Sequence, residues 1–225
     1  MSNRIVLRRL ARIHQNRCGI LLGSLCVFIL VDPHVIGTAI SIAFLGVAVV
    51  ALTGLALSPF RPRRFWPLLF LLLAMAVAET LVELQIGKHW MEPTAHATAA
   101  LFTAGIIMVL LQYVLDRRPI TADKVFGAVS AYVLIAVLFA TLFSLLQLIQ
   151  PNAFHVAAPN DPDGRLNWSG LMYFSFTVLT STGFGEITPV THQARSLIVV
   201  EQVLGVMYVA FLIARLANMY QDQRD

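Results

Sequence analysis

Charged residues are scarce in this chain. Asp, Glu, Lys and Arg make up 12% of its 225 residues, whereas 58% are hydrophobic and the mean hydropathy is +0.76. A soluble domain carries charge on about a quarter of its residues. A chain this apolar would expose too much hydrocarbon to water, which excludes an ordinary soluble protein. We therefore expect lipid to surround most of it.

Cysteine, the residue of disulfide frameworks and many metal sites, occurs only twice. Cys18 and Cys26 lie in one apolar run, about 12 Å apart along a helix, which is too far for a disulfide between them. Neither has a His or Cys at metal-ligand spacing. The sequence shows no nucleophile–base pair, metal-ligand cluster or phosphate loop, so we do not expect an enzyme.

Basic residues do not gather in a patch. They lie between the apolar runs, without interleaved aromatic residues, which argues against nucleic acid as a partner despite the net charge of +4. With six crossings and both termini in the cytoplasm, 13 of the 16 Lys and Arg residues fall on the inner side and 3 on the outer side. The sequence therefore predicts a multi-pass protein of the cell membrane.

Charged or proline-rich breaks separate six apolar segments, of which five are long enough to cross about 30 Å of hydrocarbon. The first segment is short. It either crosses as a retained, uncleaved N-terminal span or forms a re-entrant hairpin with the second. The segments are Cys18–Val31, Val35–Leu57, Phe65–Ile86, Ala95–Leu115, Val125–Ile149 and Leu197–Met219.

The fourth segment, Ala95–Leu115, contains no Lys or Arg. Voltage sensing needs several charges within the membrane field. We therefore expect residues 1–116 to form a four-helix membrane region that is not a working voltage sensor. Glu79 and Glu83 share a helix face in the third segment. Glu79 needs a partner, for which His96 is one candidate.

A seventh apolar stretch, Trp168–Leu179, is too short to cross and fits a re-entrant helix. Asn167 is expected to cap its N-terminus. Its C-terminal end, where the helix dipole favours a cation, leads into Thr180–Gly185. Irregular backbone at membrane depth is tolerated only where it is buried in protein or lines water. This stretch is therefore the predicted functional centre.

The segment Thr180–Gly185 reads Thr-Ser-Thr-Gly-Phe-Gly. An ion filter replaces the hydration shell of its ion with rings of oxygens, and carbonyls that all point one way require glycine at alternate positions. The segment resembles the Thr-Thr-Val-Gly-Tyr-Gly filter of the potassium-channel pore-domain family. Glu186 and Pro189 follow it, as an acidic residue and a proline do in that family. The resemblance covers Val125–Tyr220.

This resemblance implies an all-α membrane protein of the six-transmembrane bacterial type, lacking the Arg-rich fourth helix. Six transmembrane helices, a re-entrant pore helix and a selectivity filter would form one subunit of a homotetramer, because four filter segments are needed to enclose an ion. The transported species would be K⁺. Its ligands would be the carbonyls of Ser181, Thr182, Gly183 and Phe184 and the Ser181 hydroxyl, with Thr180 and Gly185 at the two ends.

The predicted organisation has four parts. Only five residues follow Tyr220, so we expect no cytoplasmic ligand domain in this chain. The gate is expected near Ile213–Tyr220 or in the filter itself. The parts are a membrane region (1–116), a cytoplasmic linker (117–124), a pore domain (125–220, with pore helix 168–179, filter 180–185 and inner helix 194–220) and a tail (221–225).

Several filter residues depart from the family pattern. Ser181 keeps the hydroxyl of the usual Thr but loses its methyl group. Phe184 replaces the usual Tyr, and Phe174 stands where a Trp often bonds that Tyr, so aromatic packing alone is expected to support the filter. Thr177 lies where some members place a Glu that pairs with the acid after the filter. Glu186 must then find another partner or stay solvated.

Two residues of the last apolar segment are candidate gating residues. Glu201, an acid within the membrane, is expected to bond the pore helix from behind, with Thr177 as one candidate partner. That bond either regulates the filter or is purely structural. Gly205 is either the hinge of the family's inner helix or a point of close helix packing. His155 and His192 flank the expected outer mouth, either solvated or sensing pH.

Two other functions are left open. A weakly selective cation channel would have the same fold, and reversal potentials in mixed Na⁺ and K⁺ gradients would distinguish it. A regulatory membrane subunit that does not conduct would carry no K⁺ flux in liposomes.

Overall fold

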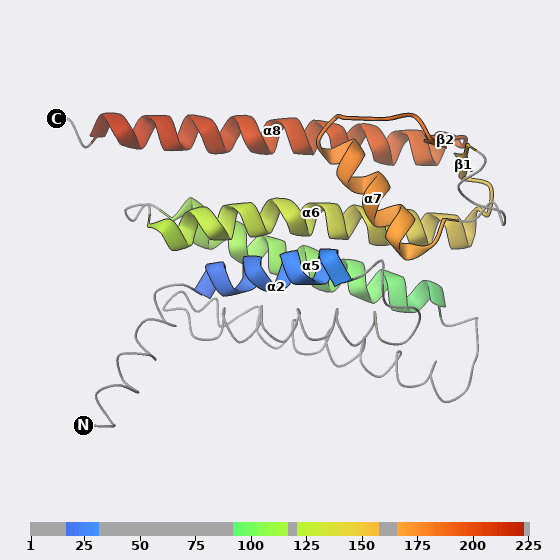
Figure 1. Ribbon diagram of the computed structural model, residues 1–225, viewed down its shortest axis with the longest axis horizontal. Coiled ribbons are helices and arrows are strands. Elements are labelled where there is room, and N and C mark those ends of the chain that lie inside the picture. The colour runs from blue at the N-terminus through green and yellow to red at the C-terminus, as the bar shows by residue number, and fades with distance from the viewer. Residues whose placement is uncertain (1–16, 32–91, 117–120, 158–165, 223–225) are drawn as a thin grey trace, which may run out of the picture. The chain divides into compact units, whose positions relative to one another are not determined.

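The computed structural model describes residues 17–31, 92–116, 121–157 and 166–222, and within these ranges the chain is mostly helical (Figure 1). The second and third predicted apolar segments, with Glu79 and Glu83, lie outside the described residues. The elements are α2 (Arg17–Val31), α5 (Glu92–Leu115), α6 (Ala122–Ile149), β1 (Phe154–Val156), α7 (Trp168–Leu179), β2 (Ile187–Pro189) and α8 (His192–Asp222).

Three of the described helices are long and apolar enough to cross a membrane. Their spanning stretches are Pro93–Leu115 in α5, Ala122–Ile149 in α6 and His192–Arg215 in α8. α2, the described part of the first apolar segment, has 15 residues, which is short for a crossing. These helices indicate a membrane protein.

The chain divides into two compact units, Met1–Leu134 and Ile135–Asp225, so α6 contributes its first half to one unit and its second half to the other. In the first unit, the described core is formed by apolar side chains of α2, α5 and the first half of α6. Leu25, Phe102 and Leu110 are almost completely buried there.

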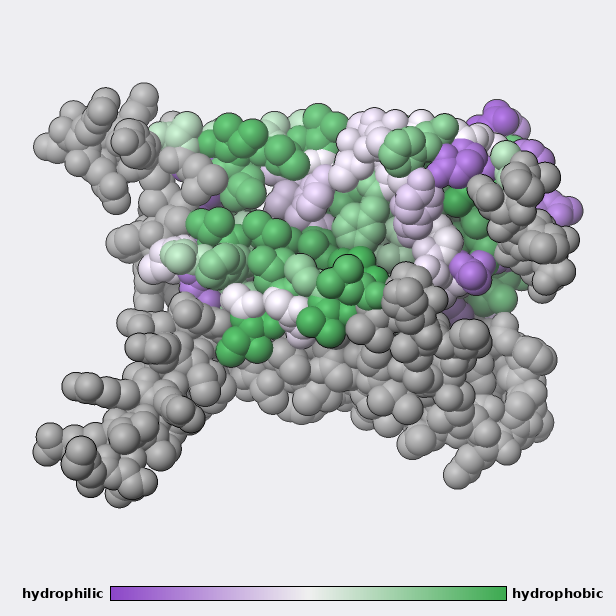
Figure 2. Space-filling view, viewed as in Figure 1, coloured by the Kyte–Doolittle hydropathy of each residue, from purple (hydrophilic) through white to green (hydrophobic). Residues whose placement is uncertain are grey.

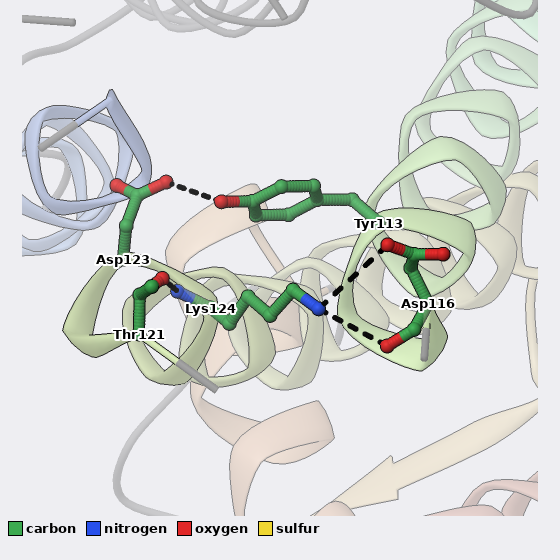
Figure 3. Close-up of polar contacts among 5 residues, drawn as sticks. All are labelled: Tyr113, Asp116, Thr121, Asp123 and Lys124. Atoms are coloured by element: carbon green, nitrogen blue, oxygen red, sulfur yellow. Dashed lines mark hydrogen bonds and ion pairs between the residues drawn. The ribbon is translucent and has the colours of Figure 1, made fainter. Parts of the chain in front are cut away.

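A polar cluster lies at the start of α6 in the first unit (Figure 3). The Asp123 carboxylate accepts the backbone N–H of Cys18 at 2.8 Å and the hydroxyl of Tyr113 at 2.9 Å. The N–H of Cys18 belongs to the first turn of α2, where it has no acceptor within its own helix, so Asp123 caps α2 from a different helix. Lys124 Nζ donates to the carbonyl of Asp116 at 3.0 Å. The cluster therefore ties α2, α5 and α6 together.

The core of the second unit contains a group of phenylalanines. The ring of Phe143 lies 5.4 Å from the rings of both Phe154 and Phe174, and the last two are 5.6 Å apart. These residues come from α6, β1 and α7. Edge-on and tilted contacts at this separation are the favoured aromatic geometry, so the cluster holds α7 on α6.

A short two-stranded antiparallel sheet, not predicted from the sequence, joins two distant segments of the second unit. β1 pairs with β2 in the register Phe154 to Pro189, His155 to Thr188 and Val156 to Ile187. The N–H of Ala157 extends the pairing by donating to the carbonyl of Glu186 at 2.8 Å. The chain after α6 is thereby fixed to the chain that follows the predicted filter.

Candidate functional site

α7 covers Trp168–Leu179, the range that the sequence predicts for a re-entrant helix, and its start is well fixed. The side chain of Asn167 accepts the N–H of Gly170 at 2.7 Å, which confirms the predicted cap. Gln147 of α6 forms two hydrogen bonds with Leu166: its amide donates to the carbonyl at 2.9 Å and its oxygen accepts the N–H at 3.2 Å. The beginning of α7 is therefore anchored to the end of α6.

Backbone handedness alternates in the segment that follows α7. The φ angles of Ser181, Gly183 and Gly185 are 56°, 53° and 91°, and neither Thr182 nor Phe184 has a positive φ. In an ordinary strand, successive carbonyls point to opposite sides. Alternation between left-handed and right-handed conformations turns every second peptide, which allows the carbonyls to point to one side. Ser181 adopts this conformation without the freedom of glycine, at a strain of about 1 kcal/mol.

The inner end of this segment is bonded to the last turn of α7. The carbonyl of Thr177 accepts two N–H groups, from Thr182 at 2.8 Å and from Gly183 at 3.2 Å. The Thr180 hydroxyl donates to the carbonyl of Phe176 at 2.7 Å and lies 2.8 Å from the Thr182 hydroxyl. Carbonyls at the end of a helix lack partners within the helix. Here the N–H groups of Thr182 and Gly183 and the hydroxyl of Thr180 are the donors to these carbonyls.

At the outer end, Tyr173 is the partner that Glu186 needs. Its hydroxyl donates to the Glu186 carboxylate, and its ring stacks on that of Phe184 at 6.4 Å with an interplanar angle of 4°. The hydrogen bond to Glu186 raises the pKa of Tyr173 above its ordinary value of 10.0, so the hydroxyl remains a donor at neutral pH. Glu186, directly after the predicted filter, therefore has a polar partner, while Phe184 itself contacts Tyr173 through ring stacking.

The role of Tyr173 was not predictable from the sequence, because the pairing with Glu186 joins residues on two different elements. The only signal was an aromatic hydroxyl on the first turns of α7, which is not specific. Phe174 lies in the cluster with Phe143 and Phe154.

Glu201 lies behind α7, but its partner is Ser175, with 2.5 Å between the two side-chain oxygens. The suggested partner was wrong: the Thr177 hydroxyl donates to the carbonyl of Phe174 at 2.7 Å. Glu201 is completely buried, with an exposed fraction of 0%. This contact links α8 to the middle of α7.

Gly205 lies four residues after Glu201, on the same face of α8. A Cβ atom at this position would lie 2.1 Å from the carbonyl oxygen of Leu179, the last residue of α7. The backbones of α7 and α8 therefore approach so closely that only glycine fits without rearrangement. The geometry demonstrates close packing at Gly205, and a hinge there stays a prediction.

The other side of the Thr180–Gly185 segment is open within one copy of the chain. Thr180 through Gly185 are all exposed, and the Phe184 side chain is 69% exposed. Figure 2 shows apolar side chains along much of α8 and hydrophilic ones near the strands β1 and β2. The large apolar side chains of α8 that are exposed are Val199, Val200, Val203, Leu204, Val206, Met207, Val209, Phe211 and Ile213.

The two candidate histidines both lie on the surface. His155 is in β1, opposite Thr188, and His192 is the first residue of α8. Both are exposed. Among the residues that the structure describes, no group of three or more His, Cys, Asp or Glu side chains could hold a metal ion.

Comparison with known proteins identifies the same part of the chain. Residues 130–222 match the family model described as "Ion channel". These residues include most of α6 and all of α7, the filter segment and α8. Neither the curated proteins nor the solved structures include a significant match to the chain.

Proposed function

From the match of residues 130–222 to an ion channel domain, we propose that the chain is one subunit of a homotetrameric channel that conducts K⁺. The ions would pass through Thr180–Gly185, with carbonyls of Ser181, Thr182, Gly183 and Phe184 and the Ser181 hydroxyl as their ligands. Thr180 and Gly185 would form the ends of this pathway.

One observation carries the proposal: the alternating handedness of Ser181, Gly183 and Gly185 directly after a short helix. An ordinary loop has no need of positive φ at every second residue, and for Ser181 it is unfavourable. A row of carbonyls replacing a hydration shell does need it. The hydrogen bonds to Thr177 and from Tyr173 support the two ends of the row.

The electrostatics of α7 favour a cation at the inner end of this row. α7 ends at Leu179, and Thr180 is its C-cap, so the partial negative charge of the helix dipole lies beside the first filter residue. No acidic side chain occurs in Thr180–Gly185. Neutral oxygens bind K⁺ weakly enough to release it, as conduction through several sites requires.

Exposure of the filter segment and of α8 supports the tetramer. One segment offers oxygens from one side only, whereas four copies around an axis surround the ion. The same assembly would cover part of the exposed apolar side chains of α8, and lipid would cover the rest. We place both termini in the cytoplasm, which agrees with the distribution of basic residues.

The test is K⁺ flux and reversal potential with the purified full chain in liposomes. Under opposed Na⁺ and K⁺ gradients, the potential should lie near the K⁺ equilibrium value. A reversal potential near zero would instead identify a weakly selective cation channel. Absence of flux from a well-folded tetramer would favour a regulatory subunit.

Two glycines provide a matched pair for this test. A Cβ added at Gly183 or at Gly23 meets nothing within 4 Å, but only Gly183 has a positive φ, at 53°. Gly183→Ala therefore introduces backbone strain of about 1–2 kcal/mol per subunit without a clash. We expect it to abolish K⁺ selectivity, whereas Gly23→Ala retains it. Equal selectivity in the two variants would contradict a filter at this position.

A further inference from the structure

The contact between Glu201 and Ser175 has a consequence for protonation. The Ser175 hydroxyl oxygen lies 2.5 Å from a carboxyl oxygen of Glu201 and 2.8 Å from the carbonyl oxygen of Ala136 in α6. Both distances require a hydrogen between the oxygens, because two oxygens this close without one repel each other. Serine has a single hydroxyl hydrogen, and a carbonyl has none. The second hydrogen must come from Glu201.

We propose that Glu201 is a neutral carboxylic acid that donates to Ser175, which in turn donates to the Ala136 carbonyl, and that this two-hydrogen chain positions α7 behind the filter. The effect of this hydrogen-bond chain on the filter rests on the proposed channel function. The protonation of Glu201 itself follows from the two oxygen–oxygen distances and does not depend on that function. Glu201 acts here as a positioning residue, since it does not touch the ion pathway.

Burial supports the neutral form independently. The second carboxyl oxygen of Glu201 is buried and has no hydrogen-bond partner among the described residues. An ionised carboxylate with one oxygen unpaired in an apolar interior costs several kcal/mol, whereas the carbonyl oxygen of a neutral acid costs far less. Because the exposed fraction of Glu201 is 0%, neither lipid nor a neighbouring subunit has access to that oxygen.

Other titratable groups nearby do not supply the missing hydrogen. Residues 135–149 of α6 contain no titratable side chain, and α7 contains only Tyr173, whose hydroxyl is bonded to Glu186. On α8, Arg195 lies six residues before Glu201 and Tyr208 seven residues after it. β2 contributes none. Glu201 is therefore the only described acid in this contact.

The chain of hydrogen bonds joins three helices at one point. Ala136 belongs to α6, Ser175 to the middle of α7 and Glu201 to α8. Two residues after Ser175, the Thr177 carbonyl holds the N–H groups of Thr182 and Gly183. Loss of the proton would leave Ser175 one hydrogen for two acceptors and release α7 from either α6 or α8. A shift of α7 would move the backbone that supports the filter.

The first experiment measures K⁺ flux in liposomes as a function of pH, from about 5 to about 10. We expect flux through the wild-type tetramer to fall several-fold, reversibly, as the pH rises and Glu201 loses its proton. Glu201→Gln keeps a hydrogen donor and cannot ionise, so its flux should be retained and independent of pH. Ser175→Ala cannot relay the hydrogen bond and should lower flux at every pH.

Ser196 provides the control, because its hydroxyl is exposed and, within the described part of the chain, bonds only to the carbonyl of His192 in its own helix. Ser196→Ala should keep the wild-type pH profile. Glu201→Ala removes the hydrogen donor and should lose flux. The proposal is overturned if Glu201→Gln loses as much flux as Glu201→Ala, or if Glu201→Gln retains the pH dependence of the wild type.

The second experiment detects the proton directly, without relying on conduction. Infrared difference spectra of the wild-type tetramer minus the Glu201→Gln variant at neutral pH should show the carbonyl stretch of a protonated carboxyl group. A carboxylate band in its place contradicts the proposal. If the protonated band is present and no variant conducts, the inference on Glu201 stands and the proposed channel function fails.

Discussion

α6 and α8 are both long apolar helices, but their surroundings differ. Of the apolar spanning stretch of each helix, 56% is buried in α6 and 11% in α8. Composition does not distinguish them, since both qualify as membrane spans by length and hydropathy. The difference shows that α6 is mostly covered by its own chain, whereas most of the α8 surface is left exposed in a single copy of the chain.

The buried side of α8 packs against α7. Glu201 and Gly205, on one face, contact Ser175 and Leu179 of α7. Apolar side chains such as Val203 and Met207 lie exposed on the rest of the helix. α8 therefore supports α7 with a narrow stripe, and in the proposed tetramer its wider face meets lipid and other copies.

The largest effect is expected from a methyl group at the α7–α8 contact. Gly205→Ala places a Cβ 2.1 Å from the Leu179 carbonyl oxygen, which is backbone and cannot rotate away. We expect a loss of about 3 kcal/mol in subunit stability. The measurement is the yield of tetramer by size-exclusion chromatography, together with its thermal midpoint.

The matched substitution on α6 is Gly127→Ala. There the added Cβ would meet the side chains of Cys18 at 3.2 Å and Val114 at 3.4 Å, which can adjust. The change should stay within about 1 kcal/mol, since alanine also favours the helix. Similar losses of stability for Gly205→Ala and Gly127→Ala would contradict the closer backbone packing inferred at Gly205. Normal assembly of Gly205→Ala with altered gating would instead favour the hinge.

A smaller loss of stability is expected at the start of α6, where Asp123 forms hydrogen bonds with α2 and α5. Asp123→Ala removes the acceptor for the Cys18 N–H and the Tyr113 hydroxyl, at a cost of about 2 kcal/mol. Asp123→Asn keeps one acceptor oxygen and should lose about half as much. Thermal unfolding of the purified tetramer tests this order, and equal midpoints for the two variants would contradict the capping role.

The smallest effect on stability should come from single cysteines on the exposed faces, introduced after both native cysteines are replaced by alanine. On α8, cysteines at Val203, Val206 and Met207 should differ in their reaction with a water-soluble thiol reagent, because in the proposed tetramer only some of these positions face the pore. On α6, cysteines at the exposed positions Phe126 and Val129 should not react, because in the proposed channel lipid covers them. Uniform labelling on both helices would contradict a pore lined by α8.

Local features of the sequence were sufficient to predict several elements. α7 has the predicted range, and Asn167 caps it through a contact only three residues long. α8 covers His192–Asp222, two residues longer at each end than the predicted inner helix 194–220, because polar residues also extend a helix beyond its apolar stretch. The β1–β2 sheet was missed, since three-residue strands leave too short a pattern to detect.

The partners of the buried and filter-supporting polar groups could not be predicted. Ser175 and Glu201 are 26 residues apart, and Asp123 and Cys18 are 105 apart. Nothing in a local pattern distinguishes Ser175 from Thr177 as the partner of Glu201, because both are small hydroxyl residues on α7. Which one faces α8 depends on the rotation of α7 about its axis, and that is set by packing.

By itself, the sequence determined the apolar segments, the short helix and the glycines that permit alternating φ angles, because these depend on composition, length and local backbone preference. The tertiary structure alone decided how that backbone is supported: the Tyr173 hydrogen bond to Glu186, the close approach of Gly205 to Leu179 and the Glu201–Ser175–Ala136 contact. Each of these joins residues from different elements, and only the packing of helices brings such residues within a few ångströms of one another.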